Sequence, residues 1–90
     1  MNLLGYIRTC TNEPQNQIET QDTQLHLFCK LYSQHTLVDV IVDKHVSSAM
    51  PFDQRKGGKK VIALLQNGAA TGLLMTELNR AFRVSITGLI

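Results

Sequence analysis

The sequence predicts an α/β domain with three layers, in which helices cover both faces of a mostly parallel sheet. Segments rich in apolar and β-branched residues alternate with segments of helical periodicity. Such alternation is typical of parallel strands joined by right-handed crossovers. The chain has 90 residues, which is the size of one small domain, so we expect residues 1–90 to form a single unit.

The first predicted strand begins at Leu3, and it leads into a loop that carries an arginine, a thiol and two hydroxyl groups. A helix over about residues 13–33 should follow. Thr11 or Asn12 can cap this helix, and apolar residues recur at three- and four-residue steps from Ile18 onward. The loop lies where a strand ends and a helix begins, which is where open α/β sheets bind ligands.

Residues 37–42 are a nearly unbroken β-branched run, which predicts a second strand that is buried. Residues 43–56 have no sustained period, so we expect a long loop that is functional or mobile. Gly57 and Gly58 then start a helix with an apolar stripe, and Gly68 should end it in the left-handed conformation.

The last part of the chain predicts one more strand and one more helix. Residues 73–75 form the third apolar segment, and Asn79 can cap a final helix with Phe82 and Ile86 on one side. The helical pattern is still running at Ile90. We therefore expect a domain that is truncated at its C-terminus.

Composition narrows the class of protein. No apolar run approaches the roughly 20 residues that cross a bilayer, and the amino terminus lacks the features of a signal peptide. We expect a cytoplasmic protein with no membrane partner, in which Cys10 and Cys29 are free thiols. His26, His35 and His45 have no metal-ligand spacing with either cysteine. No glycine-rich nucleotide pattern is present, so neither a metal nor a cofactor is expected.

Charge is distributed unevenly along the chain. The formal net charge is only +2, but after His45 six lysines and arginines face two acidic residues. A basic half is compatible with the phosphate backbone of DNA as a partner. A solvated basic face is the alternative while charge is the only observation.

Several blocks of residues resemble one family when they are taken together. The blocks span residues 5–11, 43–48, 53–58 and 78–83, with a glutamine-containing helix after the first. Their order and spacing are similar to those of the catalytic domain of serine recombinases, the resolvase and invertase family. The resemblance implies a protein that breaks and rejoins DNA through a covalent protein–DNA link. It also implies dimers or tetramers, and a separate DNA-binding domain that these 90 residues do not contain.

The resemblance also assigns roles to single residues. Arg8 and Arg55 match active-site arginines, while Cys10 stands at the position of the nucleophilic serine. Asn79 stands where the family has an acid, and Ser47 falls at a loop serine. The implied catalytic set is Cys10, Arg8, Arg55, Asn79, Arg80 and Arg83, and the implied DNA contacts are Ser47, Lys56, Lys59 and Lys60.

This set suits phosphoryl transfer without a metal, because a guanidinium binds two non-bridging oxygens at once and charge stabilisation supplies most of the rate. A thiol beside Arg8 would be a strong nucleophile, but sulfur is larger and softer than oxygen. Asn79 cannot accept a proton. We therefore expect site-specific DNA recombination that is weakened by Cys10 and Asn79. The alternative is a non-catalytic recombinase remnant that binds DNA or recombinase subunits.

Two other interpretations of Cys10 are weaker. A thiol-based phosphatase needs an arginine six residues after its cysteine, and that position is Asn16. A lone cysteine is more often a small buried residue than a nucleophile. The block that surrounds Cys10 favours the active-site position.

Overall fold

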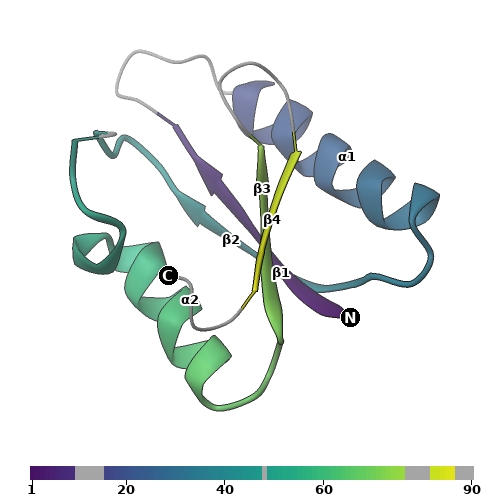
Figure 1. Cartoon of the computed structure of the whole chain (residues 1–90). Coiled ribbons are helices and arrows are strands. Elements are labelled where there is room, and N and C mark those ends of the chain that lie inside the picture. Colours follow the sequence, from purple (N-terminus) through teal and green to yellow (C-terminus); the bar gives the residue numbers. More distant parts are fainter. Residues whose placement is uncertain (10–15, 48, 77–81, 87–90) are drawn as a thin grey trace.

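A computed structural model gives the fold of the chain and describes residues 1–9, 16–47, 49–76 and 82–86. Its centre is a four-stranded sheet in the order β2-β1-β3-β4 (Figure 1). The strands are β1 (Asn2–Arg8), β2 (Thr36–Asp43), β3 (Gly72–Thr76) and β4 (Phe82–Ile86). β1 pairs in parallel with β2 and β3, whereas β4 pairs antiparallel with β3. The prediction of a mostly parallel sheet is confirmed.

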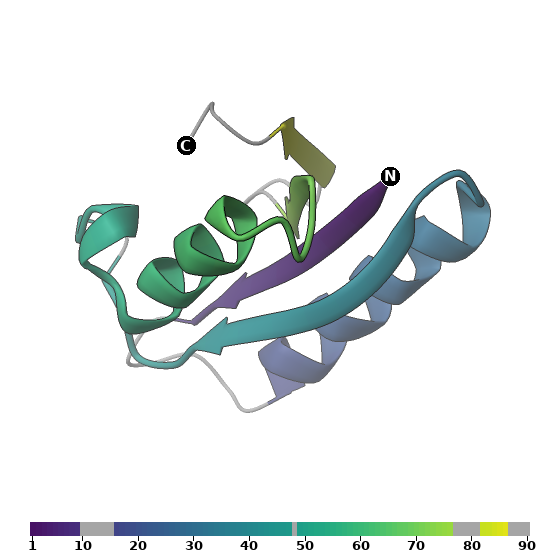
Figure 2. The same cartoon turned by 90° about the horizontal axis from the view of Figure 1, so that it is seen from below.

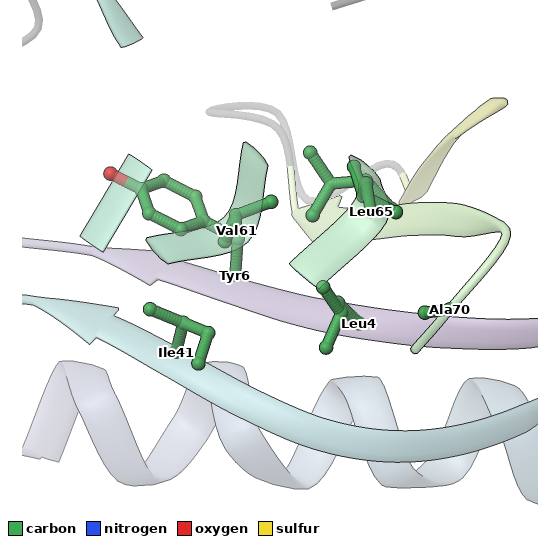
Figure 3. Close-up of a cluster of buried hydrophobic side chains, with 7 residues drawn as sticks. Leu4, Tyr6, Ile41, Val61, Leu65 and Ala70 are labelled. Atoms are coloured by element: carbon green, nitrogen blue, oxygen red, sulfur yellow. The ribbon is translucent and has the colours of Figure 1, made fainter. Parts of the chain in front are cut away.

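Two helices cover opposite faces of this sheet (Figure 2). They are α1 (Asn16–Leu31) and α2 (Lys56–Gln66), and a short 3-10 helix, η1 (Phe52–Gln54), precedes α2. Successive side chains of a strand point to opposite faces, so β1 supplies both cores. The core on the α2 side comprises Leu4, Tyr6, Ile41, Val61, Leu65, Ala70 and Leu73 (Figure 3). The core on the α1 side comprises Leu3, Ile7, Leu25 and Leu74. The three predicted layers are therefore confirmed.

The predicted helices agree with the structure over the residues that it describes. α1 lies within the predicted range 13–33, and its expected caps at Thr11 and Asn12 fall outside the described residues. α2 begins at Lys56, and Gly68 follows it with a φ of +84°. Glycine adopts this conformation at little cost, so the predicted left-handed end of the helix is confirmed.

The second strand differs from its prediction in burial. β2 pairs only with β1 among the described strands, so it forms an edge of the sheet. Val38 is 43% exposed and Val42 is 37% exposed. A register shift opposite Leu3 and Leu4 leaves Val38 without a paired residue, which marks a bulge. The prediction of a buried strand from the apolar run was wrong. An apolar run does not show whether the strand will have a neighbouring strand on both sides, and β2 has one only on the β1 side among the described strands.

The last predicted helix is replaced by a strand. Residues 82–86 form β4, in which Phe82 pairs with Thr76 and Ile86 pairs with Gly72. The sequence of this segment alternates between apolar and polar residues, so a period of two fits it as well as a helical period. The free edge of β3 provides hydrogen-bond partners for a strand, and tertiary pairing therefore decides the outcome. The expected cap, Asn79, lies outside the described residues.

Candidate functional site

The site predicted from the sequence lies at the carboxyl ends of β1 and β2. Arg8 ends β1 and pairs in register with Asp43, the last residue of β2. The half-buried Arg8 side chain donates a hydrogen bond from Nη1 to the carbonyl oxygen of Val46, at 2.8 Å. Gln21 Nε2, on α1, donates to the carbonyl oxygen of Arg8 at 3.4 Å. The side chain of Arg8 is thus bonded to the loop after β2, and its backbone carbonyl is bonded to α1.

Backbone pairing continues for one residue beyond β1. The amide of Thr9 donates to the carbonyl oxygen of Asp43 at 3.0 Å, and the amide of Val46 donates to the carbonyl oxygen of Thr9 at 2.9 Å. The buried Thr9 hydroxyl accepts a bond from the amide of His45 at 3.3 Å. These contacts fix the backbone at Thr9, directly after β1. They also fix residues 43–46 against Thr9.

Asp43 is a buried carboxylate that joins β1, β2 and α2. Its side chain is only 4% exposed. Oδ2 accepts a 2.7 Å bond from the hydroxyl of Tyr6, and Oδ1 accepts a 2.7 Å bond from the amide of Gly57. Gly57 lies in the first turn of α2, where unpaired amides and the helix dipole favour a negative charge. A Cβ at residue 57 would lie 2.7 Å from the carboxylate atoms of Asp43, so this contact requires glycine.

Tyr6 remains a hydrogen-bond donor over the physiological pH range. Burial, reinforced by the bond to Asp43, raises the pKa of the Tyr6 phenol to about 12. An ionised phenol beside a buried carboxylate would be unfavourable, because two like charges would face each other away from water. The neutral hydroxyl therefore donates to Asp43 and accepts from Arg55 Nη1 at 3.3 Å.

Arg55 reaches the same place from the segment before α2. Besides its bond to Tyr6, it donates from Nε to the carbonyl oxygen of Met50 at 3.0 Å. Its guanidinium carbon lies 5.8 Å from the centre of the Phe52 ring. Phe52 in turn packs edge-on against Tyr6, with ring centres 4.9 Å apart. Arg8 and Arg55 are therefore both fixed at the carboxyl edge of the sheet, around Asp43.

The family model described as "Resolvase, N terminal domain" matches residues 3–89 of the chain. The match includes β1 from Leu3 onward, the loop after β2, and both Arg8 and Arg55. The chain belongs to the resolvase family. A comparison with curated protein sequences finds no match.

Two solved structures show the same fold as this resolvase domain. The N-terminal catalytic domain of TP901-1 integrase superposes with a TM-score of 0.72 and 21% identity, over 89% of this chain and 57% of that chain. The C-terminal catalytic domain of ISC1926 TnpA, an IS607-like serine recombinase, superposes with a TM-score of 0.71 and 22% identity, over 89% and 52%. The resolvase domain thus spans little more than half the length of these two chains.

The structure brings some of the predicted site residues together. Arg8 bonds to the loop after β2 and Arg55 bonds to Tyr6 of β1, so both lie toward the carboxyl edge of the sheet. Lys56, Lys59 and Lys60 are exposed on the first turns of α2 directly after Arg55. The exposed Ser47 forms a local turn, in which its Oγ accepts from the amide of Ala49 at 3.1 Å. Arg83 lies in β4, opposite Met75. The remaining predicted site residues, Cys10, Asn79 and Arg80, lie outside the described residues.

Three residues of the site received no role from sequence reasoning. They are Tyr6, Asp43 and Gly57, which hold Arg55 and the start of α2 in place. Two signals could have found them. Tyr6 is a polar-tipped residue in an apolar strand, two positions before Arg8, and Asp43 ends an apolar run. A carboxylate that follows a strand and precedes a helix start is a natural partner for helix amides.

Over the described residues, no group of three or more His, Cys, Asp or Glu side chains could hold a metal ion. Within the same residues, no helix is both long enough and apolar enough to span a membrane. Cys29 on α1 is a free, half-buried thiol whose pKa is raised by burial. Its environment favours the neutral thiol, which suits packing rather than nucleophilic attack.

Proposed function

We propose that this resolvase domain binds the phosphate backbone of DNA at the carboxyl edge of its sheet and positions a phosphodiester there for transfer to residue 10. The observation that carries the proposal is the pair of half-buried guanidiniums, Arg8 and Arg55, fixed around Asp43. Two fixed cations at the carboxyl ends of parallel strands form a suitable site for an anion. Membership of the resolvase family makes a DNA phosphodiester the natural anion.

Arginine suits this role because its planar fork binds two non-bridging oxygens in one plane. Loop carbonyls and the Tyr6 hydroxyl set the orientation of both guanidiniums before DNA arrives. Less side-chain freedom is then lost on binding. In this proposal Arg80 and Arg83 complete the cage, and Ser47, Lys56, Lys59 and Lys60 contact neighbouring phosphates.

The chemical step is assigned to Cys10. Its thiolate attacks phosphorus, a phosphorus–sulfur bond forms, and the bond from phosphorus to the leaving deoxyribose oxygen breaks. The departing oxygen takes up a proton. The thiol in place of a hydroxyl and the amide of Asn79 in place of a carboxylate slow both this step and its reversal. We therefore propose recombination in which DNA binding is kept and strand exchange is weakened, with assembly into dimers or tetramers.

The binding part is tested with a fluorescently labelled mixed-sequence duplex and anisotropy measurements at several salt concentrations. Arg8→Ala and Arg55→Ala should each weaken binding about tenfold, as expected for a charge-assisted contact. Each should also lower the salt slope by about one. Lys30→Ala is the matched control, because Lys30 is an exposed cation in the last turn of α1. Equal losses in all three variants would show that only general charge matters.

The chemical part is tested by trapping a denaturant-resistant protein–DNA adduct. The wild-type chain should form little adduct, and the Cys10→Ser, Asn79→Asp double variant should form more. An adduct at Cys10 that forms as fast as in the double variant would refute the proposed weakening. DNA binding with no adduct in either protein would favour the alternative, a non-catalytic remnant.

A further inference from the structure

The described residues around Arg8 include an exposed loop histidine, His45. The amide of His45 bonds to the Thr9 hydroxyl, and the next amide, that of Val46, bonds to the Thr9 carbonyl. The carbonyl of Val46 accepts the bond from Arg8 Nη1. His45 is therefore adjacent in sequence to Val46, whose carbonyl oxygen accepts the bond from the Arg8 guanidinium. Its side chain is exposed.

His45 also has a backbone conformation that non-glycine residues adopt uncommonly. Its φ is +59°, in the left-handed region, where glycine fits at the lowest cost and where asparagine, aspartate and histidine are the most frequent other residues. Non-glycine residues in this region occur often at active sites and ligand-binding sites. Over the described residues, the imidazole makes no hydrogen bond or ion pair that would explain it. Within the described residues, its exposed ring nitrogens are open to a ligand.

We propose that His45 is a further phosphate contact of the DNA-binding edge, which acts together with Arg8 when its imidazole is protonated. This inference rests on the proposed function, since it assumes that DNA binds at this edge. A protonated imidazole donates two N–H bonds and carries a positive charge. Both properties suit the oxygens of a phosphodiester.

The charges around His45 favour an anion from outside as its partner. Arg8 ends β1, Lys44 precedes His45, and Arg55 lies just before α2. The carboxylate nearest in sequence, Asp43, is buried, and its two oxygens already accept bonds from Tyr6 and Gly57. The residues named here make this edge basic. No exposed acidic residue is adjacent to His45 in the sequence.

Binding should consequently depend on pH through His45. Histidine side chains change charge between about pH 5 and 8, and a bound phosphate favours the charged form. The complex then holds more protons than the free protein near neutral pH. By linkage, affinity for DNA rises as pH falls through this range.

The test compares three versions of the 90-residue chain by DNA anisotropy at pH 5.5 and pH 8. They are the wild type, His45→Asn and His26→Asn. Asparagine suits the left-handed backbone of residue 45, so the first variant should fold without added strain. His26 is an exposed histidine on α1 and serves as the matched control. The wild type and His26→Asn should bind about fivefold more tightly at pH 5.5, and His45→Asn should lose most of that gain while matching them at pH 8.

The outcomes separate the two proposals. Strong binding whose pH dependence is the same in His45→Asn as in the wild type would overturn the role of His45 and leave the proposed function intact. Absence of binding in all three chains at both pH values would instead overturn the proposed function, and the role of His45 with it. A second readout is the chemical shift of the His45 ring protons by NMR, which should change when the duplex is added, whereas that of the His26 ring protons should not.

Discussion

Replacing Tyr6 with phenylalanine should lower stability by removing one oxygen atom from the buried network. The variant keeps the ring that packs against Phe52, but Asp43 Oδ2 loses a 2.7 Å bond. A hydrogen bond to a charged group contributes about 1.5–3 kcal/mol. Asp43 keeps its bond from Gly57, so we expect a loss of about 2 kcal/mol in the free energy of unfolding.

For a domain of this size, 1 kcal/mol shifts Tm by about 5 °C. Thermal melts followed by circular dichroism at pH 7 should therefore place the Tm of Tyr6→Phe about 10 °C below that of the wild type. Tyr32→Phe is the matched control, because Tyr32 is 50% exposed at the end of α1, and its Tm should change by less than about 3 °C. Equal Tm values for the two variants would refute the view that the Tyr6–Asp43 bond holds this edge together.

Two further outcomes follow from the same network, and a third concerns Gly68 at the end of α2. In the native state the pKa of Tyr6 is about 12, whereas that of an unfolded tyrosine is near 10. The stabilisation from this shift is therefore complete below pH 10, and it falls by about 2–3 kcal/mol between pH 10 and 12. Urea unfolding at these pH values should show the fall in the wild type and not in Tyr6→Phe. Gly57→Ala should cost about 1–3 kcal/mol in urea unfolding, because its Cβ would meet the Asp43 carboxylate at 2.7 Å; a gain, as at an ordinary helix glycine, would contradict the geometry. Gly68→Ala has open space around its Cβ and should cost only the backbone term of about 1 kcal/mol, so a loss as large as that in Gly57→Ala would argue against a steric cause there.

Local patterns were sufficient to predict most of the fold. The three- and four-residue steps from Ile18 onward predicted α1, and the glycine at 68 predicted the end of α2, because helix period and helix ends depend on residues close in sequence. Residues 82–86 were predicted wrongly because two periods fit them. Their pairing with β3 depends on an edge that forms elsewhere in the chain.

The candidate site was predictable in part for the same reason. The block around Arg8 and the block around Arg55 each indicated a cation near a phosphate, and the structure brings both to the carboxyl edge of the sheet. The residues that hold them were not predicted. Tyr6 and Asp43 are 37 positions apart, and Asp43 and Gly57 are 14 apart, so their contacts follow from the strand register and from the placement of α2.

The edge formed by β2 also bears on how copies of the chain behave when crowded. The Asp39 carboxylate accepts a 2.8 Å bond from the amide of Val40, and the bulge at Val38 interrupts the regular spacing beside it. Both features hinder another chain from extending the sheet, because a new strand needs evenly spaced free amides. Copies of the chain at high concentration can thus stay separate folded units rather than joining into aggregated sheets. We expect this protection to matter most where the local concentration of the chain is highest.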